Sequence, residues 1–285
     1  MKKAKRSKLS RVEIKGNMPL RGVWRYFELN PNQRLLVENV KELVLLRAPE
    51  ARDDILATVK AFPRLVSLQA EYDDACYRAA SRINLSFTIS AALLRLADTL
   101  ETLSLTTAPT SYGFWINLKD YPPSLTSLNQ MAKLKDLTMA SIWIFVRQDP
   151  GNALQLPHIL PSILVRLRLI DYWGTMGTKE FPDLYPEFPN SWNAAELYCN
   201  VLMTLGGDCS PHLPDLTEVT LVSKHFCEEE AHNRGGDDSQ GHLVEISKTT
   251  QSKLRGFLRD LGIRFKLEMT VKSTAATRAD WARIG

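Results

Sequence analysis

Apolar residues recur along this chain in one short pattern, in which steps of three residues lead into a step of two. The clearest copy is the segment LRLADTLETLSL, where the apolar positions are Leu94, Ala97, Leu100, Leu103 and Leu105. Spacing by three is typical of a helix or a tight turn that leads into the next element. Spacing by two is typical of a short strand with one buried face. The pattern therefore predicts a supersecondary unit in which a turn leads into a strand.

The apolar pair that closes this unit recurs along the chain. Its first members are Leu43, Leu68, Leu103, Leu137, Leu167, Val219 and Phe265. The steps between them are 25, 35, 34, 30, 52 and 46 residues. Most of these steps exceed the ~20–29 residues of a leucine-rich repeat, so each unit is expected to carry a helix and a variable loop. Helical spacing before the strands favours helices at 89–98, 124–132, 193–205 and 249–261.

Serial units of this kind predict an α/β fold, a curved solenoid like that of leucine-rich-repeat proteins. A parallel sheet would line its concave face and helices its convex face. We expect the solenoid to span residues 18–270, after a basic flexible arm at 1–17 and before a C-terminal tail at 271–285. The stretch 227–241 is acidic, contains glycine and has few apolar residues, which predicts a mobile insertion.

The closing sequences LETLSL, LKDLTM, LVRLRL and LTEVTL follow the form L-x-x-L-x-L. With the long repeats and the last unit, LRGFLRDLGIRFKLEM, the chain resembles the fungal F-box/leucine-rich-repeat-like proteins over roughly residues 40–269. The resemblance implies a non-catalytic protein-protein interaction module, similar to the substrate-recognition repeats of a ubiquitin ligase receptor. No stretch before Val40 fits an F-box. The adaptor of a cullin-RING ligase is therefore expected as a partner only if an F-box lies upstream.

In such a unit, the residues beside the closing leucines point away from the core and would form the concave face. An unknown protein partner is expected there. The candidate binding residues on the strands are Thr102, Ser104, Thr138, Arg166 and Arg168. Arg166 and Arg168 suit bidentate binding of a carboxylate or phosphate on the partner. The alternative is pairing with Asp136 or Glu218 on neighbouring strands.

Aromatic residues recur just after the strands and complete the candidate binding surface. They include Tyr112, Trp115, Trp143, Tyr172 and Trp173. Aromatic side chains on loops at one edge of a solenoid suit an anchor pocket for a peptide. The alternative is that they fill the turn between a strand and the following helix.

Charge changes this picture only near the N-terminus. The formal net charge is +4, and residues 1–25 hold nine Lys or Arg and one Glu, which leaves −4 for the remainder. A body so close to neutral provides no argument for specific nucleic-acid binding. The basic run Lys2–Lys8 is typical of a nuclear localisation signal, with a solvated terminus as the alternative. We expect a cytoplasmic or nuclear protein, and no apolar run reaches the ~18 residues of a membrane span.

Sequence motifs for catalysis or metal binding are lacking. The four cysteines form no CxxC pair and are typical of reduced thiols inside a cell. His225, Cys227, His232 and His242 lack the close pairs of a zinc site. No phosphate-binding loop or nucleophile elbow occurs. We therefore expect no enzyme activity, cofactor or metal. The alternatives are a hydrolase or transferase whose site no local motif encodes, and a truncated remnant without function.

Overall fold

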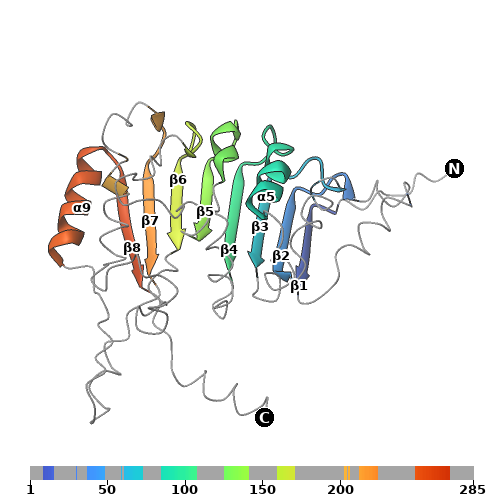
Figure 1. Ribbon diagram of the computed structural model, residues 1–285, viewed down its shortest axis with the longest axis horizontal. Helices are drawn as coiled ribbons and strands as arrows, with labels where there is room; N and C mark the ends of the chain where they lie inside the picture. The colour runs from blue at the N-terminus through green and yellow to red at the C-terminus, as the bar shows by residue number, and fades with distance from the viewer. Residues whose placement is uncertain are drawn as a thin grey trace, which may run out of the picture.

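The computed structural model describes residues 9–15, 30, 37–48, 59, 61–72, 85–107, 125–140, 159–170, 202–203, 205, 212–223 and 248–269. Within these ranges, strands β1 to β8 form one parallel sheet in chain order (Figure 1). They are β1 (Arg11–Lys15), β2 (Glu42–Ala48), β3 (Ser67–Tyr72), β4 (Thr102–Thr107), β5 (Asp136–Ala140), β6 (Arg166–Ile170), β7 (Glu218–Ser223) and β8 (Arg264–Met269). Neighbouring parallel strands require every connection to return the chain to the same end of the sheet.

The strand register confirms the repeat derived from the sequence. The first members of the closing pairs lie directly beside one another from β2 to β8, as Leu43, Leu68, Leu103, Leu137, Leu167, Val219 and Phe265. A shift by one residue would move every leucine to the opposite side of the sheet, so burial of the leucines determines this register. The irregular steps between the units are thus absorbed by the connections and leave the alignment of the strands unchanged.

Backbone hydrogen bonds repeat at the start of each strand. The carbonyl of Glu101, one residue before β4, accepts from the amides of Lys135 and Asp136, at 2.9 and 3.1 Å. The carbonyl of Lys135 accepts in the same way from Val165 and Arg166, at 2.8 and 3.0 Å. The same pair of bonds links the earlier units and joins β7 to β6, whereas at β8 only Arg264 donates to the preceding unit, at 2.8 Å to Thr217, because the amide of Ile263 donates to Leu258. The units up to β7 are therefore equivalent in backbone geometry as well as in sequence pattern.

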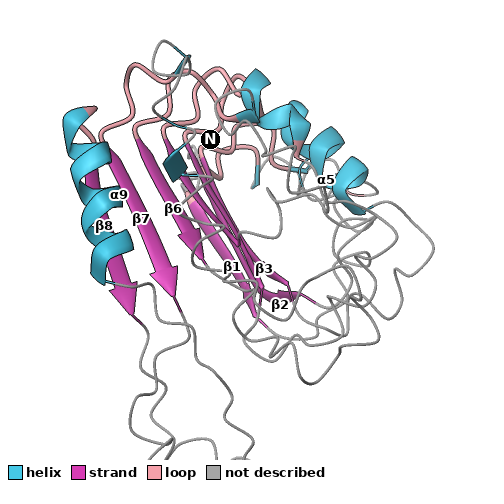
Figure 2. Cartoon of the chain, turned by 60° about the vertical axis from the view of Figure 1, so that its left-hand side comes forward, coloured by secondary structure: helices cyan, strands magenta, loops and turns pink. Residues whose placement is uncertain are grey.

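One hydrophobic cluster runs behind the whole sheet. Alternate strand residues such as Leu103 and Leu105 are fully buried in it. The same cluster includes Leu93 of helix α5 (Leu85–Leu94), Leu128 of the 3-10 helix η1 (Thr126–Gln130) and Leu258 of helix α9 (Lys248–Asp260). Helix α9 lies against β8 at one end of the sheet (Figure 2). We call the side of the sheet that contributes to this cluster the core face.

The observed helices match the expected ones in part. Helix α9 spans 248–260 where 249–261 was expected, and α5 spans 85–94 where 89–98 was expected. The segment expected to be helical at 124–132 contains only the 3-10 helix. Most of the segment 193–205 lies outside the described residues, as do the acidic stretch 227–241 and the tail 271–285. No helix in the described ranges is both long and apolar enough to cross a membrane.

One expectation is wrong, and one position of the apolar pattern departs from the core. Residues 11–15, expected to belong to a flexible arm, form β1, which pairs in parallel with β2. The apolar residues Leu9, Val12 and Ile14, of which the last two lie in β1, follow the same steps of three and two as the other units. Leu94, the first apolar position of the clearest copy of the pattern, is 41% exposed and does not belong to the core. Helix α5 ends there, and the turn that follows directs Leu96 into the core instead.

Candidate protein-binding surface

The strand residues that alternate with the core leucines form the opposite side of the sheet, which we call the polar face. Its first row comprises Arg11, Glu42, Ser67, Thr102, Asp136, Arg166, Glu218 and Arg264. Its second row comprises Glu13, Val44, Gln69, Ser104, Thr138, Arg168, Thr220 and Lys266. Strands lie ~4.8 Å apart, so neighbours within a row are in reach of one another.

The structure brings the predicted strand residues together on this face. Thr102 lies beside Asp136, and Ser104 lies beside Thr138. Thr138 in turn lies beside Arg168, and Asp136 beside Arg166. The predicted aromatic residues lie outside the described ranges: Tyr112, Trp115, Trp143, Tyr172 and Trp173.

Arg166 forms an ion pair with a carboxylate of the same sheet. Its Nε and one terminal nitrogen donate to the two carboxylate oxygens of Asp136 on the adjacent strand, the second bond measuring 2.7 Å. Asp136 raises the pKa of the Arg166 guanidinium, mainly through these hydrogen bonds. The bidentate geometry predicted for Arg166 is therefore present, with a neighbouring strand supplying the carboxylate. Its other terminal nitrogen takes no part in this pair.

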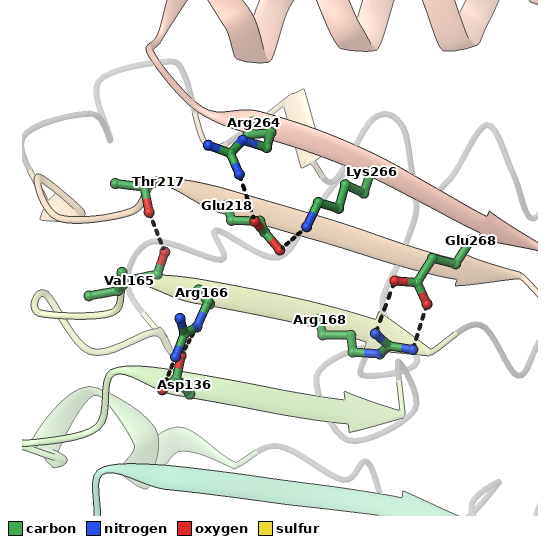
Figure 3. A network of polar contacts seen from close by, with 9 residues as sticks. All are labelled: Asp136, Val165, Arg166, Arg168, Thr217, Glu218, Arg264, Lys266 and Glu268. Carbon is green, nitrogen blue, oxygen red and sulfur yellow. Dashed lines mark hydrogen bonds and ion pairs between the residues drawn. The ribbon is translucent and has the colours of Figure 1, made fainter.

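Arg168 reaches across a strand. Its terminal nitrogens donate to the carboxylate oxygens of Glu268 on β8, at 3.1 and 2.6 Å (Figure 3). Strand β7 lies between the two residues, with Thr220 beside Arg168 and Val222 beside Glu268. Thr220 and Val222 are only 4% and 6% exposed, although neither belongs to the core cluster. The bridge passes diagonally over β7 between these two side chains and contributes to covering them.

Glu218 of β7 lies between cations on β6 and β8. It accepts a hydrogen bond of 2.9 Å from Lys266 Nζ and lies 3.6 Å from a terminal nitrogen of Arg264 (Figure 3). Lys266 lowers the pKa of the Glu218 carboxyl, first by this hydrogen bond and then by its charge. Arg264 and Arg166 lower the pKa further through their charges. Glu218 is therefore an anion that several cations share.

Arg264 is the residue that reading the sequence missed. The closing pair of the last unit begins at Phe265, so its outward flanks are Arg264 and Lys266, which lie beside Glu218 and Thr220. Strict alternation along LGIRFKLEM by itself favours Lys266 and Glu268 as the outward pair, two residues further along the strand. Aligning Phe265 with the preceding closing residues identifies Arg264. The side chain of Arg264 is 73% exposed. Its contact with Glu218 is an ion pair in which a terminal nitrogen lies 3.6 Å from a carboxylate oxygen.

The other end of the polar face carries balanced charges. Arg11 donates to Glu42 of β2 at 3.4 Å and to Glu13 of its own strand at 3.2 Å. Lys15 lies 2.8 Å from Glu13. The hydrogen bond from Lys15, followed by that from Arg11, lowers the pKa of the Glu13 carboxyl. These side chains also place charge along the outer strand of the sheet, a common protection against unwanted strand pairing.

An uncharged zone separates the two charged ends. In the first two rows it consists of Ser67 and Gln69 on β3, Thr102 and Ser104 on β4, and Thr138 on β5. Hydroxyl and amide groups can each donate and accept hydrogen bonds. A partner that contacts this zone can form hydrogen bonds without first breaking an ion pair.

The types of the described residues on the polar face decide which metal ligands this face could supply. Its two rows contain neither histidine nor cysteine. No group of three potential metal ligands occurs within the part of the chain that the structure describes.

Comparison of the chain with models of protein families, with curated protein sequences and with solved structures finds no match.

Proposed function

We propose that this chain is a non-catalytic protein-binding module that recognises its partner with the polar face. The observation that carries the proposal is the common register, which aligns outward side chains from β1 to β8 into continuous rows. A rigid sheet presents these groups in fixed positions, so little conformational entropy is lost when a partner binds. The uncharged zone supplies hydrogen-bonding groups, and the ion pairs on either side of it define its limits.

The proposal includes the architecture that the sequence predicts. A chain-order parallel sheet with equivalent units is compatible with a solenoid, and in a leucine-rich-repeat-like solenoid the polar face would be concave. The role then resembles that of the substrate-recognition repeats of F-box-type ubiquitin ligase receptors. Recognition by a preformed surface requires no chemical step, in keeping with the lack of catalytic motifs in the sequence.

The test is proximity labelling in cells with the full chain and a variant of the uncharged zone. The double variant Ser104→Arg/Thr138→Arg introduces bulk and charge where the surface is neutral. The labelled amount of each partner that binds this zone should fall at least about tenfold, because each uncompensated buried charge costs more than ~1 kcal/mol of binding free energy. Retention of the same partners at the same levels would contradict the proposed function.

A matched control separates loss of binding from loss of folding. Ser252→Arg/Gln130→Arg adds the same two charges at exposed positions on α9 and η1. Both of these helices contribute leucines to the hydrophobic cluster that packs against the core face. This control should retain the partners of the natural chain. Thermal unfolding followed by circular dichroism should show a cooperative transition for both variants. Ser252 and Gln130 are exposed, where substitutions usually change stability by less than ~0.5 kcal/mol, whereas Ser104 and Thr138 are half-buried, so the unfolding midpoint of that variant is measured alongside its binding.

A further inference from the structure

The charges on the polar face of β5 to β8 do not cancel. The described residues there include the cations Arg166, Arg168, Arg264 and Lys266. The carboxylates are Asp136, Glu218 and Glu268, so one positive charge is in excess. At the opposite end, Arg11 and Lys15 are balanced by Glu13 and Glu42, and Glu71 of β3, in the same row as Lys15, adds a further carboxylate. The excess is therefore a property of one end of the face.

Geometry places this excess at Arg264. Arg166 and Arg168 each bind a carboxylate with two nitrogens, and Lys266 donates a hydrogen bond of 2.9 Å to Glu218. Arg264 shares Glu218 with Lys266 and approaches it only to 3.6 Å. A guanidinium carries five N–H donors. Arg264 thus has the greatest freedom of the four cations to bind a carboxylate from outside.

We propose that Arg264 anchors an acidic side chain of a peptide segment in the partner, and that the adjoining uncharged polar residues of that segment cross β7, β6 and β5 to the uncharged zone. The inference rests on the proposed function and specifies its partner. Charge complementarity supports a single carboxylate over β8. A polyanion such as a nucleic acid would instead bring many closely spaced negative charges against Asp136, Glu218 and Glu268.

Sheet dimensions determine the spacing within that segment. Strands β8 and β5 are separated by three strand spacings of ~4.8 Å, or ~14 Å, and an extended chain advances ~3.3 Å per residue. The acidic residue should therefore lie about four positions from the residues that contact Thr138, in either chain direction. A segment of about twelve residues would extend across the whole sheet.

The experiment measures binding of a fluorescein-labelled peptide of about this length to the full chain by fluorescence anisotropy. The peptide has one Glu residue at one end and Ser, Asn and Gln elsewhere, and a matched peptide has Lys in place of Glu. The Glu peptide should bind more tightly, with an affinity that falls as salt is added. Arg264→Glu should weaken it at least about fivefold, and Arg264→Gln by about two- to fivefold.

Three further variants test whether binding depends on Arg264 itself. Glu218→Gln removes the carboxylate that competes for Arg264 and should tighten binding of the Glu peptide by about two- to fivefold. Arg259→Glu on α9 is the matched control, because Arg259 is 82% exposed and lies 3.7 Å from its acidic neighbour Asp260. It should leave the affinity unchanged. Lys2→Ala/Lys3→Ala/Lys5→Ala tests binding by the basic N-terminal run and should also leave it unchanged.

Several results would overturn this inference. They are failure of the Glu peptide to bind, equal binding of the Lys peptide, or loss of binding in the N-terminal variant but not in Arg264→Glu. Light scattering that shows a dimer dissolved by Arg264→Glu would identify a second copy of the chain as the occupant instead. If the peptide fails while Ser104→Arg/Thr138→Arg still removes cellular partners, only the acidic anchor is wrong. If both tests fail, the proposed function is wrong as well.

Discussion

Arg168 on β6 and Glu268 on β8 form a two-point ion pair across the strand between them, although they are 100 residues apart in the chain. Neither residue has its partner on an adjacent strand. Residues two strands apart in a sheet are separated by ~9.6 Å, which two long side chains can span. The pair therefore joins the last three strands and contributes to covering the outward side of β7.

Removing this bridge should lower stability modestly. Arg168→Ala and Glu268→Gln each remove one partner of a pair that is partly exposed, so the coupling free energy should be ~0.2–1 kcal/mol. A double-mutant cycle by urea denaturation isolates this coupling from other effects of each substitution. The exchanged variant Arg168→Glu/Glu268→Arg should recover part of the loss. A coupling of zero, with no recovery, would show that the bridge does not stabilise the fold.

Glu218 should make stability depend on pH in the acid range. Its folded pKa lies below the ordinary value of 4.5, so the unfolded chain takes up the proton first as the pH falls. The contribution of Glu218 is fully present above its unfolded pKa and is lost as the pH falls through the folded pKa. Urea denaturation of the natural chain and Glu218→Gln should show a constant difference in unfolding free energy from about pH 7 to about pH 5. The difference should shrink below that range.

An outcome opposite in sign would contradict this account of Glu218. If the difference between the natural chain and Glu218→Gln grew on acidification, the folded pKa would have to be raised.

The same substitution should have opposite effects at two glycines. Gly262 has φ of 75° and ends α9, where its amide donates to Arg259 and the next amide donates to Leu258, at 2.9 and 2.8 Å. This left-handed helix end favours glycine, so Gly262→Ala should destabilise by about 1 kcal/mol. Gly256 lies inside α9 with no atom within 4 Å of an added Cβ. Gly256→Ala should stabilise by about 0.5–1 kcal/mol. Thermal unfolding midpoints that move in the same direction would contradict this prediction.

Adjacent residues on β4 should differ sharply in their contribution to stability. Leu103 is fully buried in the core cluster, so Leu103→Ala should cost about 2–5 kcal/mol through lost apolar burial and the cavity left behind. Ser104 lies on the polar face, and Ser104→Ala should change stability by less than about 0.5 kcal/mol. Equilibrium urea denaturation of both variants measures the contrast. Similar costs at the two positions would mean that the register of β4 is wrong.

The strand leucines are the part of the fold that the sequence predicts best. Burial of Leu43, Leu103 and Leu167 on one side of a strand follows from spacing alone, because strand side chains alternate between the two sides with a period of two. The seven closing pairs found in this way are the pairs that lie in register from β2 to β8. The first strand was missed because its apolar residues lie in a run of basic residues, although Leu9, Val12 and Ile14 repeat the pattern.

By itself, the sequence determined which residues face the core and which face away, since that choice depends on local alternation and on the free energy of burying leucine. Only the tertiary structure decided the partners on the polar face. Arg166 and Arg168 are separated by one residue, yet one pairs with Asp136 on an adjacent strand and the other with Glu268 two strands away. Such choices depend on register and side-chain reach between distant segments. Arg264, by contrast, follows from the sequence once Phe265 is aligned with the earlier closing residues, and only its 3.6 Å separation from Glu218 required the structure.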